Sequence, residues 1–144
     1  MRANGVPPSD LVDTGALLAV VNARDRWHAA CLAALQAVKL PLVTTTAVLT
    51  ETFYFASKGR GLVERVWNFV RTGGITVAPI SDADLPTLDA LMARYADRPM
   101  DFADATLVHV AEREGLSTIL TIDHADFETY RIGRNAKFRI LPAR

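Results

Sequence analysis

"ILTIDHADF" spans residues 119–127, and in it a hydrophobic run gives way to two aspartates, Asp123 and Asp126. The overlapping segment "STILTI" is apolar and rich in β-branched residues, which predicts a short buried strand. Directly before it, "ADATLVHVAEREG" has the periodicity of a helix that ends at Gly115. Asp123 therefore follows a predicted strand at its carboxyl end.

The same alternation of strands and helices runs along the chain. One predicted strand ends near Asp13, and the others are "LPLVTT", "ITVAPI", "STILTI" and "KFRIL". Further helices are predicted after Thr14, at 24–38, at 47–57, at 62–72 and from 82 to about 95, with Thr14, Thr46 and Ser81 as caps. Such alternation indicates an α/β protein with a parallel sheet and helices on both faces.

The composition suits a single folded domain. The chain has 144 residues, half of them hydrophobic, and its 16 Lys+Arg balance its 16 Asp+Glu, so a basic surface for nucleic acid would have to be local. We assign residues 1–9 to a flexible leader and residues 10–144 to one domain. No apolar run has the roughly 18 residues of a membrane helix, and the N-terminus lacks the apolar core of a signal peptide. These features predict a cytoplasmic protein.

The predicted helix at 24–38 places Trp27, Cys31, Leu32 and Leu35 on its apolar face. Cys31 is the only cysteine, which excludes an internal disulfide and a cysteine-rich zinc site. Its apolar surroundings predict a buried core thiol.

Two acidic residues are predicted at the same edge of the sheet. Asp13 follows the apolar pair "LV" of the first strand, and Asp123 follows "ILTI". Sites in open parallel sheets form beyond the carboxyl ends of the strands, so these two carboxylates can meet there.

Two further acids lie on the apolar faces of predicted helices. Glu51 shares a face with Val48 and Phe55, and Asp104 heads the stripe that continues through Leu107. An acid in this position points toward the interior, where an unpaired charge is costly. For Glu51, an ion pair or a place at the edge of the apolar face remains an alternative.

Asp101 and Asp126 also fit the role of helix caps. Asp101 stands three residues before Asp104, which is the spacing at which a cap accepts a backbone N–H. We place Asp101 as a cap or behind the site acids, with direct participation in the site as the alternative. Asp126 is expected to cap the helix that begins "FETYR", with a place behind the site acids as the alternative.

Four converging carboxylates repel one another unless protons or cations neutralise them. Ligation by oxygen alone favours Mg²⁺, with Mn²⁺ as a substitute, over zinc. A bound metal lowers the pKa of a water molecule and so creates a nucleophile for phosphodiester hydrolysis. The sequence has no glycine-rich phosphate loop, Ser-His-Asp motif or HExxH motif to support other chemistry.

At these residues the chain resembles the PIN domain family, and within it the VapC-type toxins of type II toxin–antitoxin systems. The resemblance is carried by "LVDTGALLA", "TTTAVLTETFYF" and "PMDFADATLVHVAEREGLSTILTIDHADF". It implies a three-layer α/β/α sandwich with a central parallel sheet and a Mg²⁺-dependent endoribonuclease that hydrolyses RNA. The family's four acidic positions match Asp13, Glu51, Asp104 and Asp123.

The resemblance also implies supporting residues and partners. Thr14 and Thr121 match hydroxyl positions beside the first and last acid. Such toxins pair with a small antitoxin, which inserts a segment over the site, and they form homodimers. The leader before Asp10 departs from the family pattern. Alternatives are a PIN-fold nuclease of RNA processing without an antitoxin, a non-catalytic PIN-fold binding domain, and a receiver-like regulatory domain.

Basic residues near the predicted site are candidates for binding the RNA backbone. They are Lys58, Arg60 and Arg65 around "GRG", and Arg134 in "RIGRNAKFR". An ordinary solvated surface remains the alternative for them. The aromatic residues Tyr54 and Phe55 are expected to pack in the core.

Overall fold

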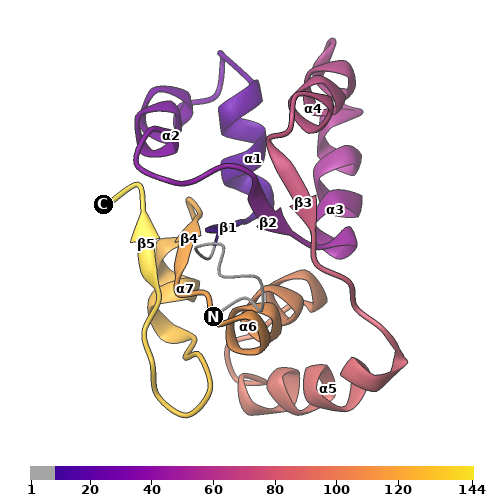
Figure 1. The fold of residues 1–144 in the computed structure, drawn as a ribbon, viewed down its shortest axis with the longest axis vertical. Coiled ribbons are helices and arrows are strands. Elements are labelled where there is room, and N and C mark those ends of the chain that lie inside the picture. The colour runs from indigo at the N-terminus through magenta and orange to yellow at the C-terminus, as the bar shows by residue number, and fades with distance from the viewer. Residues whose placement is uncertain (1–8) are drawn as a thin grey trace.

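A five-stranded parallel sheet forms the middle of the molecule (Figure 1). The structure is a computed structural model that describes residues 9–144. Its strands are β1 (Leu11–Val12), β2 (Leu42–Thr44), β3 (Ile75–Val77), β4 (Thr118–Leu120) and β5 (Arg139–Leu141). They lie in the order β3-β2-β1-β4-β5, with every neighbouring pair parallel. The order places β1 at the centre, between β2 and β4.

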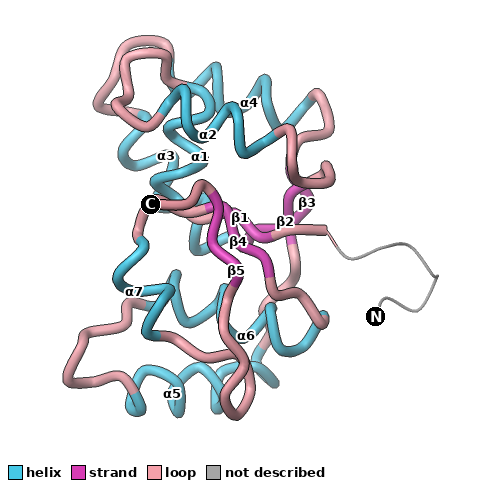
Figure 2. The backbone as a smooth tube through the Cα atoms, turned by 90° about the vertical axis from the view of Figure 1, so that its left-hand side faces the viewer, coloured by secondary structure: helices cyan, strands magenta, loops and turns pink. Residues whose placement is uncertain are grey.

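Helices cover both faces of this sheet. They are α1 (Thr14–Val21), α2 (His28–Leu35), α3 (Thr46–Ala56), α4 (Leu62–Arg71), α5 (Leu85–Arg94), α6 (Phe102–Glu114) and α7 (His124–Thr129). Figure 2 separates the layers, with α1 to α4 on one side of the strands and α5 to α7 on the other. The predicted three-layer α/β/α sandwich is confirmed.

Side chains on the two faces of the central strand pack in separate parts of the core. Leu11 and Val12 are both fully buried, and alternate side chains of a strand point to opposite faces. Leu11 packs in a cluster with Leu107 of α6, whereas Val12 packs with Leu17 of α1 and Cys31 of α2. Burial on both faces explains why the inner strands β1 and β2 are almost wholly apolar in sequence. The predicted burial of Cys31 is confirmed.

Two helices begin one residue away from the predicted caps. Asp13, not Thr14, is the N-cap of α1, and its carboxylate accepts the Thr14 N–H at 2.7 Å. Thr45, not Thr46, caps α3 and accepts the Val48 N–H at 3.3 Å. An N-cap keeps an extended backbone, so the last extended polar residue after each strand takes this role.

α2 is shorter than predicted. The carboxylate of Asp25 accepts the Trp27 N–H at 2.8 Å and forms a turn, so the helix begins only at His28. Leu32 is 40% exposed, so its predicted place on the apolar face is wrong.

The predicted leader falls almost wholly outside the described residues, which begin at Ser9. Ser9 itself is buried. Within the described part of the chain, no helix combines the length and hydropathy needed to cross a bilayer.

Candidate active site

The four predicted acids line one cavity of about 450 Å³ at the carboxyl edge of the sheet, which we call the acidic cavity. Asp13 directly follows β1, and Asp123 follows β4, its paired neighbour. Glu51 comes from the middle of α3, and Asp104 comes from the first turn of α6. Four segments far apart in the sequence therefore bring carboxylates to the same place.

Asp13 is held in a fixed orientation inside this cavity. Only 8% of it is exposed. Its two carboxylate oxygens accept the Thr14 N–H at 2.7 Å and the Thr121 hydroxyl at 3.1 Å. Burial raises the pKa of Asp13 to about 7 despite these hydrogen bonds, and the charges of Glu51 and Asp123 add to the rise.

The predicted hydroxyl residues each connect two of the acids. The Thr14 hydroxyl donates to Glu51 Oε1 at 2.7 Å, while the Thr14 backbone binds Asp13. The Thr121 hydroxyl donates to Asp13 and also accepts the backbone N–H of Asp123 at 3.0 Å. Both threonines therefore position carboxylates relative to one another.

Asp104 is fixed by a residue that sequence reasoning missed. The hydroxyl of Tyr130, a fully buried residue, donates to Asp104 Oδ2 at 2.9 Å. The predicted cap is confirmed, because Asp101 accepts the Asp104 N–H at 2.8 Å. Burial raises the pKa of Asp104 to about 8, and the charges of Asp13 and Asp101 contribute to the rise. Burial and the Asp104 carboxylate together raise the pKa of Tyr130 well above its usual value.

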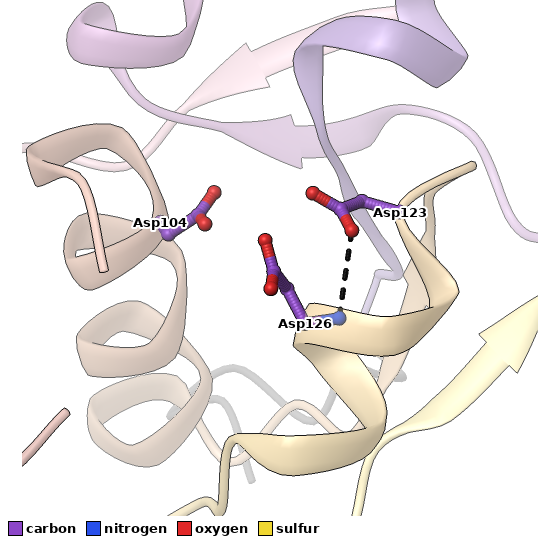
Figure 3. Close-up of side chains that lie close together, drawn as sticks. All are labelled: Asp104, Asp123 and Asp126. Atoms are coloured by element: carbon purple, nitrogen blue, oxygen red, sulfur yellow. Dashed lines mark hydrogen bonds between the residues drawn. The ribbon is translucent and has the colours of Figure 1, made fainter. Parts of the chain in front are cut away.

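Asp126 belongs to the acidic cavity rather than to a helix cap. Figure 3 shows its carboxylate converging with those of Asp104 and Asp123. The three residues offer one oxygen each, all within 4.8 Å of one another. The prediction that Asp126 caps the last helix is wrong, because Asp123 is the N-cap of α7 and accepts the Asp126 N–H at 3.4 Å. Asp126 therefore lies in the first turn.

The charge of Asp126 is partly balanced from outside the cluster. Arg98 Nε donates to Asp126 Oδ1 at 3.0 Å. Burial raises the pKa of Asp123, and its contacts with Asp126 contribute to the rise. Three neighbouring carboxylates with one arginine at the edge leave an excess of negative charge.

The donor set of the cavity suits a hard divalent cation. Seven of the described residues that line it are acidic, and none of these lining residues is Lys, Arg, His or Cys. Hard cations prefer oxygen ligands, whereas zinc sites are usually built with nitrogen or sulfur. The raised pKa values of Asp13 and Asp104 show that the folded protein favours neutralisation of these groups, which a cation can supply.

A separate basic cavity of about 460 Å³ lies between the turn after α1 and the start of α4. Arg60 and Arg65, both predicted to bind RNA, line it together with Arg24. Lys58 lies over the ring of Tyr54. Arg134 is exposed on the turn between α7 and β5. In Figure 1 the loop from α7 to β5 lies at the opposite end of the molecule from α4. The structure thus groups two of the four predicted basic residues.

Comparison with known proteins gives consistent matches. The family model for the PIN domain matches residues 11–133. Ribonuclease VapC26 of Mycobacterium tuberculosis is 28% identical over 134 residues, which cover 92% of this chain and 99% of that protein. The crystal structure of Mycobacterium tuberculosis VapC20, described as a sarcin–ricin loop cleaving toxin, has the same fold. Its TM-score is 0.70 at 21% identity, over 81% of this chain and 91% of that one.

Proposed function

The chain belongs to the PIN domain family, and we propose that it is a metal-dependent endoribonuclease, the toxin of a type II toxin–antitoxin pair. The relative that supports this activity is a ribonuclease similar to this chain over almost its whole length. We assign residues 10–144 to this one nuclease domain. We also propose a cytoplasmic location, where such a protein would meet cellular RNA.

The convergence of carboxylates at the sheet edge carries the proposal. Asp104, Asp123 and Asp126 would hold Mg²⁺, with Mn²⁺ as a substitute, and Asp13 and Glu51 would complete the site. When bound, the ion lowers the pKa of a water molecule and offsets charge on the scissile phosphate. The reaction is the attack of water on the phosphorus, with departure of a ribose oxygen.

The surrounding residues keep these carboxylates in place. Thr14 and Thr121 orient Glu51 and Asp13 through their hydroxyl groups. Tyr130 does the same for Asp104 from the core of the protein. Groups held in this way need little reorganisation when the substrate arrives, which lowers the barrier to reaction.

We assign the RNA backbone to the basic cavity. Arg24, Arg60 and Arg65 present guanidinium groups that bind phosphates in bidentate fashion. Lys58 and Arg134 remain predicted RNA contacts. A small antitoxin and a second copy of the chain are the proposed protein partners. The second candidate function, a PIN-fold nuclease of RNA processing, shares this site and differs by having no antitoxin.

Cleavage of total tRNA and rRNA tests the proposal. The wild type, Asp13→Asn and the control Asp89→Asn are each compared with Mg²⁺ and with EDTA. Asp89 is an exposed acid on α5, outside the acidic cavity. Discrete fragments are expected only from the wild type and Asp89→Asn, and only with metal. Absence of cleavage by folded, partner-free wild type with Mg²⁺ or Mn²⁺ would leave the non-catalytic binding domain as the function.

A further inference from the structure

A cavity of about 840 Å³ lies between α3 and α6, and we call it the aromatic cavity. Tyr54, Phe55 and Phe102 line it with exposed fractions of 58%, 48% and 45%. Glu51 and Asp101 line both this cavity and the acidic one. The two cavities therefore adjoin at residues of the proposed active site.

The exposure of these rings contradicts the expectation that Tyr54 and Phe55 pack in the core. The buried face of α3 consists of Val48, Thr52 and Ala56, which are spaced four residues apart. Tyr54 and Phe55 fall outside that face. Several large apolar side chains gathered around an open cavity mark a binding site more often than an ordinary surface.

We propose that the aromatic cavity holds an unpaired base of the RNA, adjacent to the scissile phosphate, by stacking on Tyr54 and Phe102; this inference rests on the proposed nuclease function. Tyr54 lies one turn beyond Glu51 on α3, and one helical turn is about 5 Å. Phe102 stands two residues before Asp104 on α6. Because Glu51 and Asp101 line both cavities, a base held in the aromatic cavity would lie directly beside the acidic one.

The charges around the cavity favour a base over other occupants. Lys58 Nζ lies over one face of the Tyr54 ring, 4.6 Å from its centroid, so the base would stack on the other face. In that position Lys58 can bind the phosphate of a neighbouring nucleotide. Glu51 and Asp101 would repel a phosphate inside the cavity but can accept hydrogen bonds from the amino groups of a base. The apolar face of a second copy would bury these two acids without partners, at a cost in free energy.

The test measures binding with an inactive parent, Asp104→Asn, in Mg²⁺ buffer. One probe is a fluorescent unpaired RNA of about 12 nucleotides, within the usual range of single-strand sites. The second probe has the same ribose–phosphate backbone without bases. Tyr54→Leu and Phe102→Leu are made in the parent, because leucine keeps apolar volume but cannot stack. The matched control is Trp67→Leu, an aromatic residue of α4 that is 44% exposed.

The parent is expected to bind the complete RNA about tenfold more tightly than the RNA without bases. Tyr54→Leu and Phe102→Leu should remove most of this difference and leave binding of the RNA without bases unchanged. Trp67→Leu should retain the difference. Equal affinity of parent and variants for the complete RNA, or an equal loss for both probes, would overturn the proposal.

Two further outcomes are separable. Light scattering measures whether Tyr54→Leu dissociates a dimer. If it does, and the resulting monomer binds RNA as the parent does, the aromatic cavity is a contact between copies and the proposal is overturned. If wild type cuts no RNA but the parent still binds bases through Tyr54, the nuclease function fails and the base site stands. Absence of RNA binding by the parent overturns the base site, and the nuclease function falls with it only if wild type cuts no RNA.

Discussion

Replacement of Asp104 by Asn should stabilise the metal-free protein while it abolishes RNA cleavage. Asn has nearly the same shape, and its side-chain oxygen can still accept the hydroxyl of Tyr130, which lies 2.9 Å from Asp104 Oδ2 in the wild type. What the substitution removes is a buried negative charge beside Asp13 and Asp101. Without a cation, repulsion among these carboxylates lowers the stability of the folded protein.

The size of the effect follows from the raised pKa of Asp104. A rise from the ordinary value of 3.8 to about 8 sets an upper limit of about 6 kcal/mol, at about 1.4 kcal/mol per pKa unit. Because water enters the open cavity and side chains relax, we expect about 2 kcal/mol at a pH of about 8.5. For a chain of 144 residues this corresponds to a rise in Tm of about 4–8 °C.

The pH dependence has a definite sign. A carboxyl group whose pKa is higher in the folded state than in the unfolded state stabilises the fold fully below about pH 4. This contribution is lost as the pH rises through the folded-state value of about 8 for Asp104. The Asn variant lacks this titration, so its advantage over wild type should be near zero at about pH 4 and greatest at about pH 8.5.

Thermal melts in EDTA at several pH values, followed by circular dichroism, measure this difference. Asp89→Asn on the surface of α5 is the control and should match wild type at every pH. An Asp104→Asn variant that is less stable than wild type at about pH 8.5, or whose advantage does not change with pH, would refute the reasoning.

Three further predictions concern the metal ion, Tyr130 and the basic cavity. Addition of Mg²⁺ at neutral pH should raise the Tm of wild type by several degrees and that of Asp104→Asn by less, and EDTA should reverse both shifts. Equal shifts for the two proteins in a melting assay would show that the ion does not bind at Asp104. Tyr130→Phe should lower the free energy of unfolding by about 1 kcal/mol, and it should lower kcat about tenfold with KM little changed, because Asp104 loses its fixed orientation. Steady-state cleavage kinetics that match wild type would exclude this positioning role. The double variant Arg60→Glu/Arg65→Glu should weaken RNA binding and lower its salt dependence by the equivalent of about two phosphate contacts. Arg71→Glu, outside the basic cavity, should change neither the affinity nor its salt dependence, and a salt titration of RNA binding distinguishes the two results.

The strand-end acids were predictable because their positions follow from local patterns. Asp13 and Asp123 each follow a buried strand, and the rule for parallel sheets brings such residues together. Glu51 and Asp104 were recognisable as acids on apolar helix faces. These signals depend only on periodicity, which short segments express without help from the rest of the fold.

The remainder of the site depends on contacts between distant segments. Asp126 enters the cavity because Asp123 caps α7, a difference of three residues in where the helix begins. Tyr130 reaches Asp104 only after α7 and α6 have packed, and no pattern near residue 130 indicates this. The exposure of Tyr54 likewise depends on which face of α3 meets α6 and α1. Local periodicity does not contain this information.

Three helices, α1, α6 and α7, begin at the acidic cavity, and their N-caps are Asp13, Asp101 and Asp123. Each of these carboxylates meets free amide groups and the positive end of a helix dipole. Asparagine caps helices about as well as aspartate does, whereas alanine does not. With Asp13 and Asp123 as the proposed site residues, a single substitution of either by asparagine is expected to end catalysis and leave the helix starts intact. A gene that encodes such a protein can therefore lose the enzyme activity by one mutation while its product remains folded and able to bind its partners.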